Sequence, residues 1–208
     1  MDDSYRHPVE EKKVKFKQNP VAGSKKQNVI WIFTVTVASF LISAILTVAS
    51  SDVLKEADII TAFLVILFII LVNILFDIIG TAVTAADETP FHAMASRKMY
   101  GAKQSIRLIR NADKVSNVCN DVVGDICGII SGAAGAYIIF RIIGSQEAIT
   151  VAELAVTGLI TALTVGGKAL GKSIALRNSN YIIYKVSIVI KFLKDKFSFI
   201  KRKGKTRK

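Results

Sequence analysis

The chain has 208 residues, of which 28 are Lys or Arg and 16 are Asp or Glu, so its formal net charge is +12. Hydrophobic residues still make up 51% of the sequence, and the mean hydropathy is +0.45. This apolar content excludes an intrinsically disordered chain, and a count of two cysteines excludes a disulfide scaffold. A soluble core of this size rarely combines such hydrophobicity with so few aromatic residues. We therefore expect an all-α, polytopic membrane protein in which apolar spans alternate with basic flanking segments.

The N-terminal part of the chain combines a polar tail with two apolar runs. Residues 1–28 are polar and punctuated by Pro and Gly, which predicts a flexible cytoplasmic tail. Residues 29–49 contain no charged side chain in 21 positions, too long a run for the apolar region of a signal peptide. At about 1.5 Å per residue, a helix of that length crosses the roughly 30 Å hydrocarbon core of a bilayer. A second span is predicted at 59–79, interrupted only by Asn73 and Asp77.

A break and an amphipathic segment follow the second span. Pro90 lacks an N–H donor and disfavours helix in the residues just before it. Residues 96–110 then place apolar side chains on one face and five Lys and Arg residues mostly elsewhere. This spacing predicts an amphipathic helix at the membrane surface, within a cytoplasmic belt of helices over 87–114.

The C-terminal half contains two weaker spans and two basic segments. Residues 115–143 are long enough to cross a bilayer and rich in Gly and Ala, which allow close approach between helices. Residues 150–165 predict a fourth span, after which Lys168 and further basic residues follow. Residues 181–193 are apolar but short and interrupted by a lysine, so we expect an interfacial helix and no fifth span. Residues 196–208 form a basic tail.

The distribution of positive charge predicts the orientation of these spans. Lys and Arg number seven in 1–28, one in 50–58, six in 87–114, none in 144–149 and thirteen after residue 165. This alternation fits four spans in the cell (plasma) membrane with both termini in the cytoplasm. It also accounts for the basic excess through orientation and contact with anionic lipids. We expect no nucleic-acid partner, because the sequence contains no zinc-ligand spacing, RNP motif or Gly-rich phosphate loop.

Acidic residues inside the spans are the candidates for a functional site. A charged side chain in a bilayer costs about 2.5–3.5 kcal/mol on insertion scales, so several at one depth require compensation. Asp121 and Asp125 are four residues apart and share a helix face, with Asn117 and Asn120 on or beside it. Carboxylate, amide and hydroxyl oxygens suit a hard cation such as Mg²⁺. The candidate ligands are Thr84, Asp87, Asn120, Asp121 and Asp125.

A structural reading competes with the cation site. The acids could cap helix starts or pair with Lys114 or Lys172, and we favour this reading for Asp77 while favouring the site for Asp125. Glu88 could cap or neutralise the start of the helix that follows it. We assign Glu88 and Lys172 a structural or gating role next to the site.

Two separated stretches of the sequence carry recognisable motifs. The first contains Glu88-Thr89, Gly101-Ala102-Lys103, and Asn111-Ala112-Asp113-Lys114 with Ser116. The second is the run from Gly167 to Ser179 (GKALGKSIALRNS). In this order and spacing they resemble the transmembrane domain of the CNNM/CorC (CorB) magnesium transporters. That family has Glu-Thr at the end of a core helix, Gly-x-(Lys/Arg)-x-Ala and Asn-Pro-Asp-Arg in the belt, and Gly-Glu-(Ile/Val)-Leu-Pro-Lys after the last span. The resemblance covers residues 59–195.

The resemblance implies a dimer with three core helices per subunit, a belt of short helices and Mg²⁺ held by Ser, Asn and backbone oxygens. Carried over, the family's serines fall at Ala85 and Asp87, and its Asn-rich motif falls near Asn120-Asp121 or Gly124-Asp125, in no single register. The chain departs from the pattern in its more acidic site, in Gly171 where the family has Pro, in its extra span 29–49, and in having no counterpart of the family's CBS pair.

We therefore expect a homodimeric membrane protein that transports or binds a divalent cation, with Mg²⁺ as the ion. A non-transporting membrane scaffold or regulator that kept the same fold is the alternative. We expect no enzymatic activity, because Ser and Thr residues occur without a His–Asp arrangement that would activate a nucleophile.

Overall fold

The computed structural model describes residues 25–56, 58–143 and 146–205, and these residues form helices without any strand. The all-α fold predicted from the sequence is confirmed. The chain divides into two units, Met1–Thr36 and Val37–Lys208. The contacts that define the fold are those among the helices from α2 onward, within the second unit.

The first helix, α1 (Lys25–Glu56), is longer than the predicted span at both ends. Within it, Val29–Val48 is long and apolar enough to cross a membrane, and none of the side chains of this segment is buried. The predicted loop 50–58 is therefore helical as far as Glu56. Most of the predicted N-terminal tail, residues 1–24, lies outside the described residues.

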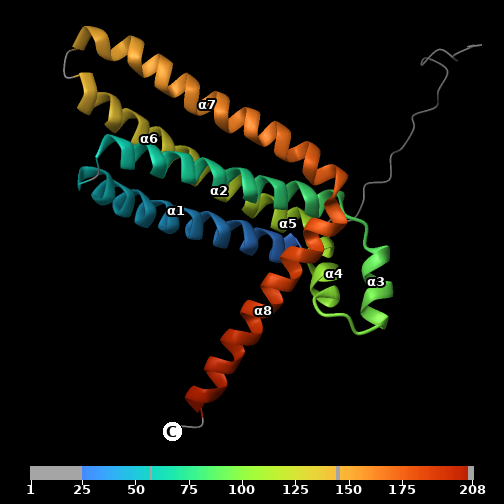
Figure 1. Ribbon diagram of the computed structural model, residues 1–208. Coiled ribbons are helices and arrows are strands. Elements are labelled where there is room, and N and C mark those ends of the chain that lie inside the picture. Colours follow the sequence, from blue (N-terminus) through green and yellow to red (C-terminus); the bar gives the residue numbers. More distant parts are fainter. Residues whose placement is uncertain (1–24, 57, 144–145, 206–208) are drawn as a thin grey trace, which may run out of the picture. The chain divides into compact units, whose positions relative to one another are not determined.

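Three long helices pack side by side, namely α2 (Ile59–Ala85), α6 (Val123–Ile143) and α7 (Gln146–Arg177), as Figure 1 shows. One core joins α2 to α6 and consists of Ala62, Ile66, Ile70, Ala134 and Ile138. These positions recur every four residues, so each helix buries a single stripe. On α7, glycines take the place of larger side chains where Ile74 and Ile78 of α2 press against it. The small residues thus permit close helix packing.

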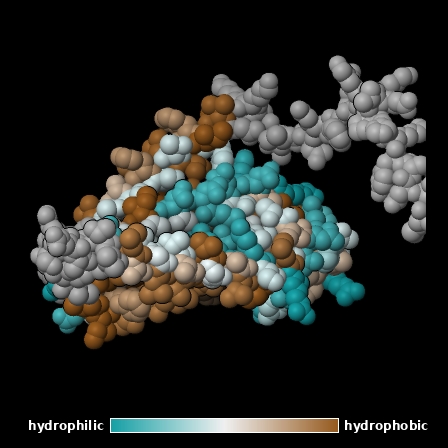
Figure 2. Space-filling view, turned by 90° about the horizontal axis from the view of Figure 1, so that it is seen from above, coloured by the Kyte–Doolittle hydropathy of each residue, from teal (hydrophilic) through white to brown (hydrophobic). Residues whose placement is uncertain are grey.

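Together with α1, the described residues contain four helices that qualify as membrane spans by length and composition: Val29–Val48, Ile59–Ala85, Ala112–Ile139 and Glu153–Arg177. Figure 2 shows hydrophobic side chains spread over much of the visible face and most hydrophilic side chains in the centre and right of the view. Such helices identify a membrane protein, compatible with a lipid bilayer as its surroundings.

The belt consists of two short helices, α3 (Thr89–Ser96) and α4 (Ala102–Arg110), with Pro90 in the first turn of α3. The prediction of a single amphipathic helix over residues 96–110 is wrong. Lys98 and Gly101 between the two helices have φ angles of 56° and 89°, which an α-helix does not contain. The amphipathic pattern belongs to α4 alone.

A second core fastens the belt to the bundle and consists of Ala82, Val83, Phe91, Ala175 and Ile183. Ile183 comes from α8 (Ser179–Lys205), which begins just after α7 and diverges from the bundle (Figure 1). Among the described helices, α8 does not qualify as a span by length and composition, and its position at the membrane interface stays a prediction. The helix continues through part of the predicted basic tail, and residues 206–208 lie outside the described residues.

Candidate functional site

A buried polar cluster lies inside the bundle and is built around α2. Asn73 and Asp77 are 3% and 4% exposed, and their spacing of four residues stacks them on one face of α2. Asn73 follows Ile59 by 14 residues, which is about 21 Å along the helix axis. The cluster therefore lies within the length of the span and away from its first end.

The charge that faces Asp77 comes from α7. The Nζ atom of Lys168 lies 3.9 Å from Oδ1 of Asp77, and the two side chains are 26% and 6% exposed. The sequence placed Lys168 beyond a fourth span ending at residue 165, and that boundary is wrong, because the apolar span runs from Glu153 to Arg177. A lysine is compatible with this interior because a carboxylate lies opposite it.

Gly124 of α6 lines the cluster from the third helix. A Cβ atom at this position would lie 3.5 Å from Nζ of Lys168 and 3.7 Å from Oδ1 of Asn73. The ammonium and carboxamide groups thus both lie over the bare backbone of Gly124. Side chains from α2 and α7 consequently meet above a position on α6 that carries no side chain of its own.

One turn farther along, the cluster is continued by a π-helix, Asn117–Val122, that joins α5 (Ala112–Ser116) to α6. The sequence predicted one continuous helix here and did not predict the π-helix. Asn120 within it packs its carboxamide directly on Gly80 of α2, where a Cβ atom would collide with it. Its Nδ2 donates to Oγ of Ser116 at 3.2 Å. Short π-helical segments inside α-helices are frequent at functional sites.

Three buried oxygens of this region have no hydrogen-bond partner among the described residues: Oδ1 of Asn73, Oδ2 of Asp77 and Oδ1 of Asn120. An unsatisfied buried polar atom costs about 1–3 kcal/mol. All three are hard oxygen donors, the kind that Mg²⁺ and Ca²⁺ take as ligands. Because the ammonium of Lys168 balances the charge of Asp77, the cluster as a whole is formally neutral. A cation or a water molecule would satisfy these oxygens.

The predicted ligands Thr84 and Asp87 are engaged in local structure. The hydroxyl of Thr84 donates to the carbonyl of Thr81 at 2.8 Å. Oδ1 of Asp87 accepts hydrogen bonds from the backbone N–H and the hydroxyl of Thr89, at 3.0 and 2.9 Å. These bonds, the backbone one first, lower the pKa of Asp87 below its ordinary value. Asp87 thus shapes the turn that opens α3, and its own N–H donates to Asn180 at 2.9 Å.

The predicted ligands on the third span divide between the interior and the surface. Asn120 lies beside the polar cluster, whereas Asp121 and Asp125 are exposed. Among the described residues, no group of three or more His, Cys, Asp and Glu side chains could hold a metal ion. Asn and Thr oxygens, which can also bind a hard cation, are a separate matter. The structure thus brings one of these three residues to the buried oxygens and leaves the two acids on the outside of the helix.

Glu88 joins the two belt helices. Its Oε1 accepts hydrogen bonds from Nε of Arg110 at 2.7 Å and from Nε2 of His92 at 2.8 Å. Burial raises its pKa, but the hydrogen bonds from His92 and Arg110 and the charges of these residues lower it by more, so the net direction is downward. Glu88 stands at the N-cap of α3, as predicted, but its side chain makes no capping hydrogen bond and instead contacts Arg110 of α4. Lys172, predicted to act with it, is exposed.

Asn73 and Lys168 are part of the site, although no pattern in the sequence gave either of them a role. The signal for Asn73 was its spacing of four residues from Asp77, the same spacing that singled out the pair Asp121 and Asp125. Nothing in the spacing joined Lys168 to Asp77, because they lie on different helices 91 residues apart, as 168 − 77 gives.

Comparison with known proteins gives no relative for this chain: no family model, no curated protein and no solved structure matches it.

Proposed function

We propose that the chain binds and moves a hard cation at the polar cluster inside its bundle, with Mg²⁺ as the ion that the CNNM/CorC resemblance suggests. The observation that carries this proposal is the set of three buried oxygens, on Asn73, Asp77 and Asn120, that lack partners among the described residues. A bilayer interior offers such oxygens no water, so leaving them there is costly unless a ligand meets them.

Lys168 determines how a cation would enter. Its ammonium lies 3.9 Å from Asp77, so a dication at the cluster must compete with a positive charge already present. A lysine side chain is long and flexible enough to withdraw, which would release the Asp77 carboxylate for the cation. Binding therefore requires Lys168 to move away from Asp77.

Flux measurements test the transport proposal. Purified protein in liposomes that contain a Mg²⁺ indicator should carry Mg²⁺ faster than empty liposomes do. Asp77→Asn keeps the size of the side chain but removes its charge, and should reduce the flux about tenfold or more. Glu153→Gln, which removes an exposed acid of the same bundle, is the matched control and should leave the flux unchanged. No flux above that of empty liposomes, or equal flux in wild type and Asp77→Asn, contradicts the proposal.

The competing function is a membrane scaffold or regulator that transports nothing. The contact between Lys168 and Asp77 favours it, because a carboxylate whose charge is balanced by a lysine needs no cation for neutrality. Removing one partner of a buried pair typically costs about 3–5 kcal/mol, whereas replacing both by apolar residues is often neutral or stabilising. A scaffold should therefore tolerate the double variant Asp77→Leu/Lys168→Met without loss of function.

Thermal stability in detergent separates the two functions. A bound ion increases the free energy of unfolding by RT ln(1 + [L]/Kd), and this raises the Tm. Under the transport proposal, millimolar Mg²⁺ raises the Tm of the wild type and leaves that of Asp77→Leu/Lys168→Met unchanged. A scaffold gives the same Tm with and without Mg²⁺ in both proteins.

The same proposal includes a homodimer. Asp121 and Asp125 are exposed within the third span, and a carboxylate that faces lipid is unfavourable. A second copy of the chain would cover them. A single cysteine at Ile129, one turn beyond Asp125 and 56% exposed, should then form a disulfide between subunits, whereas one at Leu71 of α2, 52% exposed, should not. Cross-linking at neither position, together with a monomeric mass in detergent, opposes the dimer.

The surroundings of the bundle complete the proposal. The chain resides in the plasma membrane with both termini in the cytoplasm, binds no nucleic acid and catalyses no reaction. The alternation of basic segments supports this orientation, since Lys and Arg accumulate on the cytoplasmic side of membrane proteins.

A further inference from the structure

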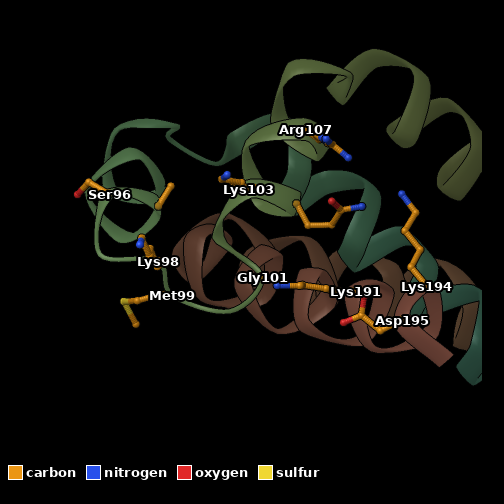
Figure 3. A pocket seen from close by; sticks show the side chains of 11 residues that line it. Ser96, Lys98, Met99, Gly101, Lys103, Arg107, Lys191, Lys194 and Asp195 are labelled. Carbon is orange, nitrogen blue, oxygen red and sulfur yellow. The ribbon is translucent and has the colours of Figure 1, made fainter. Parts of the chain in front are cut away.

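A cavity of about 620 Å³ lies at the belt, between the α3–α4 turn, α4 and the C-terminal half of α8 (Figure 3). Basic side chains dominate its walls: Lys98, Lys103, Arg107, Lys191 and Lys194. The volume falls within the roughly 300–1,000 Å³ of small-molecule sites. The cavity lies outside the four spans, so it is separate from the buried cluster.

The one acid that lines the cavity is already engaged. Oδ2 of Asp195 accepts a hydrogen bond from the hydroxyl of Tyr100 at 2.9 Å. Nζ of Lys191 lies 3.9 Å from the centre of the Tyr100 ring, in a cation–π contact. Burial, and then the bond and charge of Asp195, raise the pKa of Tyr100, so its hydroxyl keeps its proton. The acid and one lysine thus stabilise the wall, and the positive charge of the other basic residues remains available.

Four basic side chains of the cavity, those of Lys98, Lys103, Arg107 and Lys194, form no ion pair within the described part of the chain. Like charges around one cavity repel each other, and this repulsion weakens when an anion binds among them. Lys side chains and the planar fork of Arg are the groups that proteins use for phosphate. The cavity therefore has the chemistry of an anion site.

The backbone of the turn holds one of these lysines in an unusual conformation. Lys98 has a φ of 56°, a region that residues other than Gly rarely adopt. Gly101, at a φ of 89°, lets the turn approach Ile188 of α8, since a Cβ there would lie 3.2 Å from Cγ1 of Ile188. Such backbone conformations persist where the surrounding structure enforces them, and they concentrate at ligand sites.

We infer that this belt cavity binds a phosphate-bearing anion through Lys98, Lys103, Arg107 and Lys194. The phosphate belongs either to the headgroup of a phosphorylated membrane lipid or to a soluble molecule, because both present the same chemistry to these side chains. This site is more specific than the general attraction of a basic surface to anionic lipid, which depends on total charge and not on position.

Binding to purified protein in detergent tests the inference with short-chain probes. The lipid probes are dioctanoyl phosphatidylinositol 4,5-bisphosphate and, as a singly charged comparison, dioctanoyl phosphatidylserine. Inositol 1,4,5-trisphosphate is the soluble probe. We expect a probe with several phosphates to bind about tenfold or more tightly than phosphatidylserine. If the trisphosphate binds as tightly as the phosphoinositide, the phosphate groups alone are sufficient for binding, and the ligand can be a soluble molecule. If only the phosphoinositide binds, the phosphate belongs to a membrane lipid.

Two double variants of equal charge locate the binding. Lys103→Gln/Arg107→Gln removes two positive charges from the cavity and should weaken binding about tenfold. Arg177→Gln/Lys185→Gln removes two exposed positive charges outside it and should change binding less than about twofold. All four side chains lie outside the cores, so both variants should fold, which unchanged circular dichroism would verify. Equal weakening by both variants, or phosphoinositide binding no tighter than phosphatidylserine, overturns the inference.

Discussion

Gly80 is the residue at which α2 comes closest to the π-helix. A Cβ atom there would collide with the carboxamide of Asn120, which is held by its bond to Ser116. We predict that Gly80→Ala lowers the stability by about 1–3 kcal/mol, the usual cost of overpacking, although alanine is the better helix former. Gly128→Ala, where no atom lies within 4 Å of the new Cβ, should not destabilise. Thermal unfolding in detergent measures both.

A second substitution should restore the stability that Gly80→Ala loses. Because the clash involves only the end of the Asn120 side chain, Gly80→Ala/Asn120→Ala should recover most of the stability that Gly80→Ala loses. A double-mutant cycle then gives a coupling between the two positions. Additive losses would mean that the two residues are not in contact.

Glu88 gives a residue-scale prediction about pH. Its folded-state pKa is lowered below the ordinary 4.5, so its contribution to stability is full above that pH and disappears as pH falls through the lower folded value. Wild type should therefore have a higher Tm than Glu88→Gln at pH 7, and the difference should shrink as the pH falls below 4.5. Thermal scans between pH 7 and pH 3 measure it, with Glu153→Gln as the control. A difference that stays the same from pH 7 to pH 3 would assign the effect to something other than the carboxylate charge.

At the scale of elements, Gly101 determines how α4 follows α3. Its φ of 89° is costly for a residue with a Cβ atom, by about 1–2 kcal/mol, and the new Cβ would also approach Ile188 closely. We predict that Gly101→Ala loosens the belt and lowers the Tm, whereas Gly166→Ala on α7, where the Cβ meets open space, does not. Proteolysis of the belt in detergent should quicken for Gly101→Ala alone. Unchanged protection in that variant would refute the role given to the turn.

The elements also show what could be predicted from the sequence and why. Uninterrupted apolar runs predicted the spans, because only a helix satisfies its own backbone in lipid. Predictions made from the pattern of a single helix were wrong where contacts with another helix determine the structure. The end of α7 was predicted at residue 165, since Lys168 reads as a flank until Asp77 is known to face it. The turn at 97–101 was missed because apolar spacing continues across it, and the π-helix has no signal in the spacing.

The candidate site shows the same limit. The acids Asp121 and Asp125 stood out in the sequence, yet they are exposed. Of the three residues with buried oxygens, Asn120 was a predicted ligand, Asp77 was judged structural and Asn73 was given no role. A helix face can be derived from spacing, but which face is buried depends on the neighbours that cover it. Only the packing of α2 against α6 and α7 selects Asn73 and Asp77.

At the scale of the whole molecule, the polarity of the chain is separated between a lipid-compatible bundle and a basic belt. Asp77 and Lys168 form a buried charge pair inside the spans, with no net charge, whereas Asp121 and Asp125 in the third span are exposed. Placing such a charge pair inside a bilayer costs far less free energy than placing either charged side chain there alone. The separation predicts that the belt and the loop between α1 and α2 lie on opposite sides of the membrane.

Labelling of single cysteines tests that topology. The native Cys119 and Cys127 are buried and are first replaced by serine. Asp58→Cys, before α2, should then react with a membrane-impermeant maleimide added outside intact cells. Arg97→Cys in the belt and Tyr181→Cys on α8, both exposed, should react only from the cytoplasmic side, in inside-out vesicles. Since α2 is one span, labelling of Asp58→Cys and Arg97→Cys from the same side would refute the four-span arrangement. Labelling of Arg97→Cys and Tyr181→Cys from opposite sides would mean that only one of α6 and α7 crosses the membrane, because two crossings return the chain to the belt side before α8 begins.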